Sequence, residues 1–444
     1  MEETASGKLI RQNSSASTGS DYHLVKDMHL AESQMELATP SEVLLSIEEE
    51  SPMPNRCIYK VPYHLRNLNR KSYTPQVISI GPLHHGNKNL QTMEKYKVKY
   101  LNAFASRVNK SFESLLVMVT TKEERVRKCY EENIGLTSLE FANMILHDAT
   151  FIIEYLLRDM FPGQCTDEGE KVLKPWLTSK IKLDFLLLEN QLPFFILKDL
   201  YQLVLVTDRI MYRPFIQVVF RYFHFLNTQQ KSSSSDQFNG ILHFVDLMRS
   251  FYLPPIERES CRSYHYEEMY CASQLAEAGL IFKKSESLCQ LDLKFQDGVL
   301  EIPGFTLDKD TEVCAQNLMA LEQLHYPHEA YITDYFRLLD FLIDTDKDVG
   351  LLRRKKILVN RLGENCATIV NNLCSNYHVA DTPTIYYELR RELFRFYNNP
   401  WNSWKIKLRS DLSTPWVIVS TTGAIFLLVL TLVQTVCTVI STVK

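Results

Sequence analysis

The chain has 444 residues, of which 45% are hydrophobic and 23% charged, and its formal net charge is −4. This balance is typical of a globular protein with a sizeable core, so it excludes a chain that is disordered throughout. It also argues against a nucleic-acid partner, which would require a concentrated basic face. The one basic run, Arg353–Lys356 with Arg361, is typical of a solvated helix face.

Residues 1–50 are polar and Ser-rich, and they form the first predicted part of the chain. They hold ten acidic and three basic residues, a net charge of −7 that leaves +3 for the remainder. They contain no apolar run of the length found in a secretory signal peptide. We therefore expect a disordered acidic tail at 1–50.

The region 55–410 is expected to be helical, because glycine is scarce and helical spacing dominates. It could form one domain or two, and the sequence does not distinguish these alternatives. Residues 139–157 are apolar nearly all round, which predicts a largely buried helix. Residues 332–343 and 383–397 predict helices with one charged side. The polar Ser-rich run 227–240 predicts a loop inside this region.

One short segment departs from helical spacing. Leu293–Pro303 alternates around Asp297-Gly298, which predicts a β-hairpin. The expected fold is therefore mainly α, a helical soluble domain with at most a small β-hairpin, plus one C-terminal transmembrane helix.

The stretch DFLLLENQLPFFIL, residues 184–197, places three polar residues inside a very apolar segment. A helix through Leu188 would be buried, and Pro193 would break it because it lacks an N–H. The amides of Asn190 and Gln191 could then satisfy orphaned carbonyl groups. Glu189 would need a basic residue or backbone donors as partners. A buried helix–bend–helix corner is expected here, and a functional carboxylate at Glu189 is the alternative.

The C-terminal segment predicts membrane attachment. The run Trp416–Ile440 has 25 residues and no charge. A helix of that length spans roughly 37 Å, enough to cross a bilayer, so we expect a transmembrane helix at 415–440. Lys405, Lys407 and Arg409 precede it, which places the domain on the cytosolic side. The alternatives are a buried C-terminal helix and a glycolipid-anchor signal, and the latter needs the missing signal peptide.

The ten cysteines are scattered, and none forms a Cys-x-x-Cys pair. The sequence therefore lacks the spacing of a zinc ribbon or a thioredoxin-like site. Isolated cysteines suit a reducing compartment, where they behave as small hydrophobic residues.

Several blocks, read together, resemble a known family. The chain resembles the plant family called domain of unknown function 247, also known as uncharacterised protein family 0481, from about residue 55 to 440. The resemblance implies a helical domain with a C-terminal membrane helix and no established catalytic activity. Some members of that family are linked to self-incompatibility. At Cys271 this chain has Cys-Ala-Ser-Gln where a Pro-Ser-Ala-Thr-like segment is typical, which puts any role of that segment in doubt. The blocks that carry the resemblance are Ile58–Arg66, Val77–Gly86 (VISIGPLHHG), Met93–Leu101, Asp148–Leu157, Phe185–Phe195 (FLLLENQLPFF), Leu275–Phe282, Asp292–Pro303, Glu312–Gln323 and Asp346–Leu351.

Adjacent His84 and His85, on a turn bounded by glycines, are the sharpest candidates for chemistry. Neighbouring side chains on an extended segment point to opposite sides, so a single metal ion would need a turn and further ligands, for which His147 and Asp148 are candidates. We expect instead that the turn histidines bond to backbone or pack under a helix. An enzyme centred on His84, His85 and Glu189, metal-dependent or hydrolytic, is kept as an alternative.

Three other groups are weaker candidates. His325 and His328 are separated by Pro327, which disfavours a helical metal-binding face. Asp148 and Glu154 lie six residues apart in a helix and so face different ways, which favours ion pairs with basic residues elsewhere. The third group could imitate a Cys–His pair but has no oxyanion-type Gly loop: His265, Glu267, Glu268 and Cys271.

The sequence contains no Walker A, GxGxxG, GxSxG or HExxH motif. We therefore expect a non-enzymatic, membrane-anchored interaction or signalling module, with no catalytic, cofactor-binding or metal residues. Its expected partners are membrane lipid, through the C-terminal helix, and an unidentified protein. Neither nucleic acid nor a small-molecule substrate is expected. An extracellular recognition protein is the third hypothesis.

Overall fold

The structure is a computed structural model of the chain. It describes residues 56–67, 69–161, 173–207, 213–234, 238, 240–255, 269–374, 384–402 and 415–443. The chain divides into two units, Met1–Pro54 and Asn55–Lys444. The expected disordered tail at 1–50 lies outside the described residues and stays a prediction.

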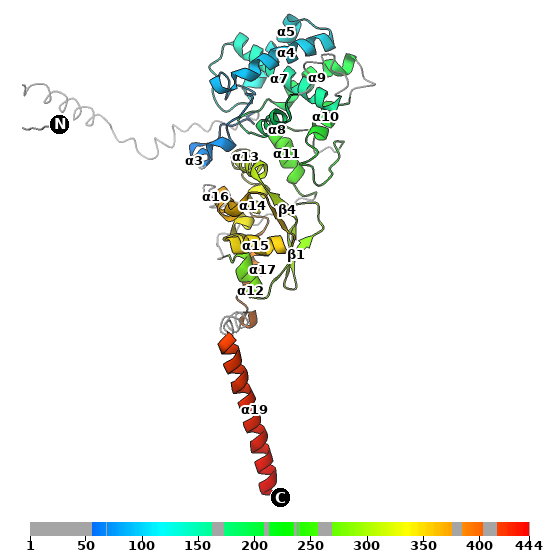
Figure 1. The fold of residues 1–444 in the computed structure, drawn as a ribbon. Helices are drawn as coiled ribbons and strands as arrows, with labels where there is room; N and C mark the ends of the chain where they lie inside the picture. The colour runs from blue at the N-terminus through cyan, green and yellow to red at the C-terminus, as the bar shows by residue number, and fades with distance from the viewer. Residues whose placement is uncertain are drawn as a thin grey trace, which may run out of the picture. The chain divides into compact units, whose positions relative to one another are not determined.

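Helices dominate the described residues, which confirms the mainly α prediction (Figure 1). The helix predicted at 332–343 corresponds to α14. The helix predicted at 383–397 corresponds to α17, which begins at Tyr387, and residue 383 lies outside the described part of the chain. The first helices are α3 (Tyr63–Arg66), α4 (Gln91–Val108), α5 (Phe112–Thr120), α6 (Glu123–Arg127), α7 (Ser138–Met160), α8 (Pro175–Asp184), α9 (Phe194–Thr207), α10 (Phe215–Tyr222) and α11 (Phe244–Tyr252). The later ones are α12 (Ala272–Glu277), α13 (Lys309–His325), α14 (Tyr331–Leu342), α15 (Asp346–Arg354), α16 (Cys366–Cys374), α17 (Tyr387–Tyr397) and α19 (Pro415–Val443). Short 3₁₀ helices lie at η1 (Arg70–Ser72), η2 (Lys88–Leu90) and η5 (Gly363–Asn365).

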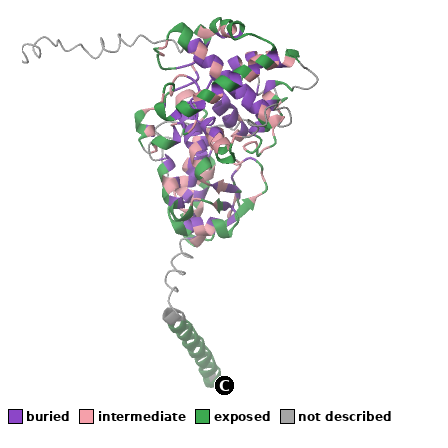
Figure 2. Ribbon diagram, turned by 45° about the horizontal axis from the view of Figure 1, so that its top comes forward, coloured by how far each residue is buried: buried purple, intermediate pink, exposed green. Residues whose placement is uncertain are grey.

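The helix α7 is the centre of the first helical group. Thr137 and Glu140 start it with a capping box, in which Glu140 Oε2 accepts a hydrogen bond from Thr137 N at 2.9 Å. Helices α4, α5, α9 and α10 pack around α7. Most residues of α7 are buried, and Figure 2 shows the buried residues gathered in the interior of the molecule. The predicted buried helix at 139–157 is confirmed.

The helix α13 connects the early and late parts of the domain. It contacts α8, α11 and η1, and also α14, α16 and β4. Two of its side chains reach the first residues of the domain. Asn69 Nδ2 donates to Glu312 Oε1 at 2.9 Å, and Asn317 Nδ2 donates to Ser72 O at 2.7 Å. The start of the domain is thus held by a helix far along the sequence.

The predicted hairpin at Leu293–Pro303 is present. Strand β2 (Lys294–Gln296) runs antiparallel to β3 (Val299–Pro303). Asp297 and Gly298 between them have positive φ angles of 50° and 77°. A two-residue type I′ turn requires this conformation at both central positions.

Further strands extend beyond the one predicted hairpin. Strand β1 (Ile281–Ser285) pairs in parallel with β3, which gives the sheet order β1-β3-β2. Strand β4 (Phe305–Leu307) pairs in parallel with β5 (Leu358–Asn360). Parallel strands are joined by long connections rather than by a tight turn. These pairings therefore leave no local turn signal in the sequence.

The predicted loop at 227–240 has a structural role where it is described. Gln229 Nε2 donates to the carbonyl oxygens of Phe251 and Leu253 at 2.7 and 3.0 Å, and Lys231 Nζ donates to Leu253 O at 2.7 Å. The loop thereby satisfies carbonyl groups that the C-terminus of α11 leaves without helical partners.

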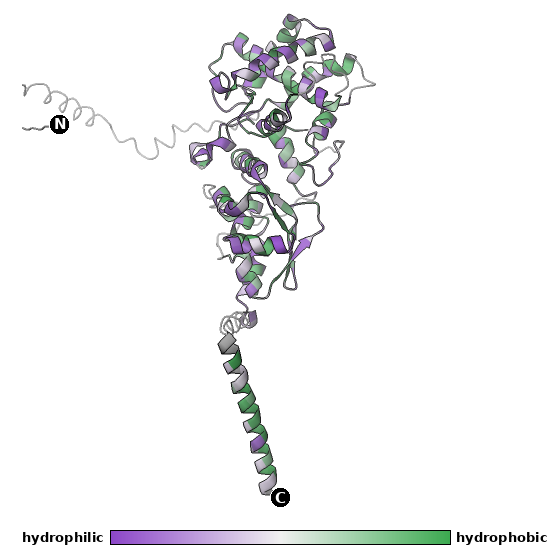
Figure 3. Ribbon diagram, in the orientation of Figure 1, coloured by the Kyte–Doolittle hydropathy of each residue, from purple (hydrophilic) through white to green (hydrophobic). Residues whose placement is uncertain are grey.

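The last helix, α19, contains the apolar stretch expected at 415–440. Within the described residues, Thr422–Thr442 is the one helical segment long and apolar enough to cross a membrane, and none of it is buried. Figure 3 shows apolar residues along α19.

Candidate functional site

Glu189 lies in the corner between α8 and α9, and this corner differs in detail from the expected one. The helix α8 ends at Asp184 rather than at Leu188. Side-chain amides cause the early end, because they take the groups that would continue the helix. Asn190 Nδ2 donates to Asp184 O at 3.0 Å, and Leu188 N donates to Asn317 Oδ1 at 2.9 Å.

The expected role of Asn190 and Gln191 is confirmed. Gln191 Nε2 donates to the carbonyl oxygens of Phe185 and Leu187, both at 2.8 Å. Asn190 Oδ1 also accepts from Ile80 N at 2.7 Å. Both amides are buried, so each satisfies carbonyl groups that water does not reach. They fix the backbone on either side of Glu189.

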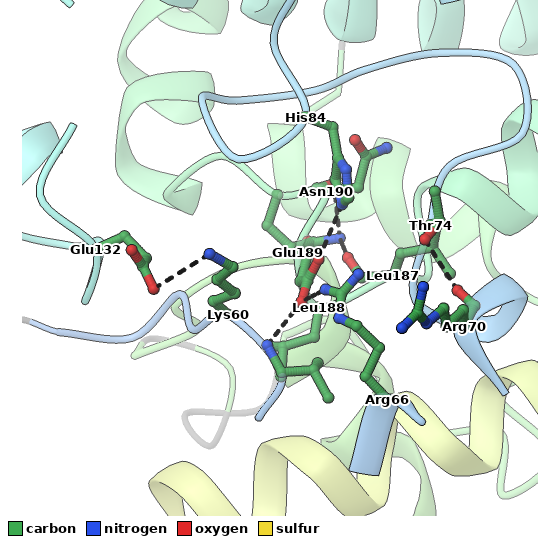
Figure 4. A network of polar contacts seen from close by, with 12 residues as sticks. Lys60, Arg66, Arg70, Thr74, His84, Glu132, Leu187, Leu188, Glu189 and Asn190 are labelled. Atoms are coloured by element: carbon green, nitrogen blue, oxygen red, sulfur yellow. Dashed lines mark hydrogen bonds and ion pairs between the residues drawn. The ribbon is translucent and has the colours of Figure 1, made fainter. Parts of the chain in front are cut away.

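The Glu189 carboxylate joins three segments of the chain (Figure 4). Oε1 accepts a hydrogen bond from Val61 N at 2.7 Å and forms an ion pair with Arg66 Nη2. Oε2 lies 3.0 Å from His84 Nε2. The carboxylate therefore has both kinds of partner that its sequence context predicts, a basic side chain and a backbone donor.

The contacts also keep Glu189 ionised. Burial by itself would raise the pKa of this carboxyl, because a charge is poorly solvated in the interior. The contacts with His84, Arg66 and the Val61 amide outweigh burial, so the pKa of Glu189 lies below its usual value. A carboxylate held in this form accepts hydrogen bonds and is not a proton donor near neutral pH.

The loop that carries His84 is fixed at its first residue. Gly81 has a φ angle of 73°, and a Cβ added there would lie 2.6 Å from Gln191 O. Only glycine fits this left-handed turn without a clash. Gly81 N donates to Asp148 Oδ2 at 2.8 Å, so the loop is fastened to α7 as well as to the α8–α9 corner.

Asp148 in turn forms a buried ion pair with Lys97. The Lys97 ammonium lies 2.6 Å from Asp148 Oδ1, 2.6 Å from Glu94 Oε1 and 2.6 Å from Ser79 O. Burial would lower the pKa of Lys97, but these acceptors raise it overall. Asp148 is thus a support for the histidine loop, not a ligand beside the histidines.

A cavity of about 510 Å³ opens beside this cluster. Arg66, His84, His85 and Glu189 line it, together with Lys60. The described lining residues include no serine, threonine, cysteine or tyrosine. The described lining therefore brings charged side chains together and supplies no hydroxyl or thiol nucleophile.

Of the candidate residues, His84 and Glu189 are in contact, and His85 lines the same cavity without a described contact to either of them. His85 is exposed, and the His147 ring lies 2.8 Å from its own helix carbonyl, Asn143 O. Within the described residues, no group of three or more His, Cys, Asp or Glu side chains is arranged to hold a metal ion.

The remaining candidates also lie apart or outside the described part. The helix α13 ends at His325, so His328 does not share a helical face with it, and the His325 ring lies 2.7 Å from Tyr59 Oη. Cys271 precedes α12 as its cap. Its three proposed neighbours lie outside the described residues: His265, Glu267 and Glu268.

The expected ion pairs on α7 are confirmed at Glu154 as well. Glu154 Oε1 lies 2.5 Å from Arg107 Nε, and Oε2 lies 3.7 Å from Arg158 Nε. Glu154 is fully buried. Asp148 and Glu154 therefore each pair with a basic residue of α4 instead of forming an acid–base couple.

Sequence reasoning did not find a further buried pair, Arg249 with Glu322. Arg249 Nε lies 3.3 Å from Glu322 Oε1, which also accepts from Ile332 N at 3.0 Å. Burial raises the pKa of Glu322 to about 7. The one signal in the sequence is an acid inside the apolar run LMALEQL, and nothing there indicates that its partner is 73 residues earlier.

Comparisons with known proteins find one family model and two relatives that match most of this chain. The family DUF247, described as a plant protein of unknown function, matches residues 58–430. The UPF0481 protein At3g47200 of Arabidopsis thaliana is 26% identical, over 91% of this chain and 90% of its own length. The putative UPF0481 protein At3g02645 of the same plant is 20% identical, over 85% and 89%. No solved structure matches. The chain belongs to the DUF247 family of plant proteins of unknown function.

Proposed function

We propose that this protein is a non-enzymatic interaction module, anchored in a membrane by α19 with its helical domain in the cytosol. The observation that carries the proposal is the segment Thr422–Thr442, which is strongly apolar and has none of its residues buried. Lipid would cover these side chains, as the hydrophobic effect demands for such a long apolar surface.

The polar cluster supports a structural role for the charged residues. Glu189 already contacts Val61 N, Arg66 and His84, so it has little capacity left for a substrate. General acid–base catalysis needs a group that can exchange a proton near the working pH. The lowered pKa of Glu189 does not suit that task. Binding surfaces, rather than a catalytic cleft, would then carry the function.

Alkaline extraction of membranes tests the anchor. The full chain should resist extraction, and a chain that lacks 412–444 should be released. A matched control replaces Thr422–Thr442 with an unrelated apolar helix of equal length. This chimaera should also resist extraction. Full-length protein that is released as easily as the deletion variant contradicts the anchor.

Protease protection on intact vesicles tests the side of the membrane. Asn109 suits this test, because it is exposed in the turn between α4 and α5 and begins an Asn-Lys-Ser sequon. A cytosolic domain should leave an N-terminal tag open to protease and Asn109 without a glycan. A protected tag and a glycosylated Asn109 would instead support the extracellular recognition hypothesis. In either case, intact membranes that return no reproducible protein partner count against the interaction module.

The enzyme hypothesis retains one favourable observation, the 3.0 Å contact between His84 and Glu189. Elemental analysis of the purified protein distinguishes the two functions. Stoichiometric zinc or iron that disappears in a His84→Ala, His85→Ala double variant would replace the interaction module with a metalloenzyme.

A further inference from the structure

A second cavity, of about 540 Å³, lies between α8, α13 and β4. Its volume is in the range of small-molecule sites. Leu186, Leu318 and Phe336 contribute buried apolar surface, and Phe305 on β4 adds a second buried ring. This floor suits the apolar or aromatic body of a ligand.

Lys182 places a positive charge at this cavity. Its Nζ lies 3.5 Å from the centre of the Phe225 ring and 5.6 Å from that of Tyr222. No carboxylate of the described residues lies within ion-pair distance of Lys182. Burial lowers the pKa of Lys182, although Asp159 and Asp310 partly offset this effect. The ammonium group is thus partly desolvated. Aromatic rings lie in contact with it, while Asp159 and Asp310 are close enough to raise its pKa without forming an ion pair.

Two acidic residues, Asp308 and Asp310, also line the cavity, and they differ in whether their carboxylate already has a partner. Asp308 caps α13, since its Oδ1 accepts from Thr311 N at 2.8 Å and from Thr311 Oγ1 at 2.7 Å. Its charge therefore already serves the helix N-terminus. Asp310 is exposed as a residue, but its carboxyl is partly desolvated. This desolvation and the charge of Asp308 raise the pKa of Asp310. Lys182 is accordingly the charged group best placed to bind a ligand.

We propose that this cavity binds a small apolar carboxylate, with the apolar body against Leu186, Leu318 and Phe336 and the carboxylate on Lys182 Nζ. The carboxylate would pair with Lys182, which has no ion-pair partner among the described residues, in a partly dehydrated site where charge-assisted hydrogen bonds are strong. This assignment goes beyond the interaction module and gives the domain a ligand by which binding to partners could be regulated.

Calorimetric titration of the full chain in lipid nanodiscs tests the proposal, with empty nanodiscs as the blank. The probes are naphthoate, naphthylmethanol and naphthylmethylamine, which share one ring system and differ in charge. Naphthoate should bind most tightly. Lys182→Met should weaken naphthoate binding about tenfold, a change of the size expected for one charge-assisted contact. Lys182→Arg should restore most of the affinity.

Two further variants control the experiment. Lys180→Met removes a neighbouring lysine on α8 that does not line the cavity, and it should leave naphthoate binding unchanged. Ala315→Phe fills the cavity from α13 and should abolish binding, with thermal unfolding used to show that the variant is folded. The proposal is overturned if naphthoate does not bind, if Lys182→Met binds it normally, or if the amine binds more tightly than the acid.

Discussion

Replacement of Glu189 by glutamine tests whether the polar cluster is structural. The glutamine has nearly the same shape and can still accept the hydrogen bond from Val61 N. It loses the charge that pairs with Arg66 and that lies 3.0 Å from His84 Nε2. Removing one partner from a buried ion pair typically costs about 3–5 kcal/mol. The Arg66 and His84 side chains retain 20% and 11% exposure, so water solvates them in part and we expect a loss of about 3 kcal/mol.

Equilibrium unfolding of the full chain in urea, followed by circular dichroism, measures this loss. Glu132→Gln is the matched control, because Glu132 lines the same cavity and lies 3.7 Å from Lys60. These two side chains are 44% and 57% exposed, so their pair should contribute at most about 0.5 kcal/mol.

Two results would refute the reasoning. The first is an equally small change in the free energy of unfolding for both variants, which would mean that the Glu189 ion pair does not stabilise the fold. The second is a gain in stability for Glu189→Gln. Functional sites commonly hold charges at the expense of stability, so a gain would indicate that the cluster serves binding or catalysis.

Three further predictions concern residues around this site. Gly81→Ala should lower the free energy of unfolding by more than about 3 kcal/mol in the same urea assay, because Gly81 has a left-handed φ and an added Cβ would clash with Gln191 O. Gly86→Ala is the control. Gly86 also has a positive φ but open space around it, so this variant should lose only about 1 kcal/mol. Asn190→Ala should lower the free energy of unfolding by about 3 kcal/mol, because it leaves buried backbone groups without hydrogen-bond partners. Thermal unfolding measures this loss, and a loss smaller than that of Gly86→Ala would contradict the prediction. Burial lowers the pKa of His243 from 6.5 to about 4. Because the pKa of His243 is lower in the folded state, the unfolded state binds the proton first, and the free energy of unfolding should fall by up to about 3 kcal/mol between pH 6.5 and about pH 4. In urea titrations over this pH range, His243→Asn should lose less stability by this amount.

The sequence predicts local features of this fold well. The buried helix at 139–157, the hairpin at Asp297-Gly298 and the apolar C-terminal helix each depend on periodicity or turn chemistry within a short window. The parallel pairings of β1 with β3 and of β4 with β5 do not, because each joins segments that only packing brings together.

In the candidate site, too, local features can be predicted from the sequence and distant contacts cannot. The polarity of Glu189, Asn190 and Gln191 within an apolar segment indicates that each needs partners, and the structure supplies them. The identity of those partners cannot be predicted, because Arg66 is 123 residues from Glu189 and nothing local connects them. The end of α8 at Asp184 also depends on a distant residue, since Asn317 takes the amide of Leu188.

The contacts between the first residues of the domain and α13 have a consequence for how the protein folds during synthesis. Tyr59 meets His325 across 266 positions, and Ser72 O receives the Asn317 amide across 245. Until the ribosome has made α13, the segment that holds Val61 and Arg66 lacks these stabilising neighbours. Contacts between residues far apart in the sequence slow folding, and helices made before α13 keep apolar surface exposed until these contacts form. The nascent chain should therefore depend on chaperones until α13 emerges, and a fragment that ends near 226 should aggregate rather than fold.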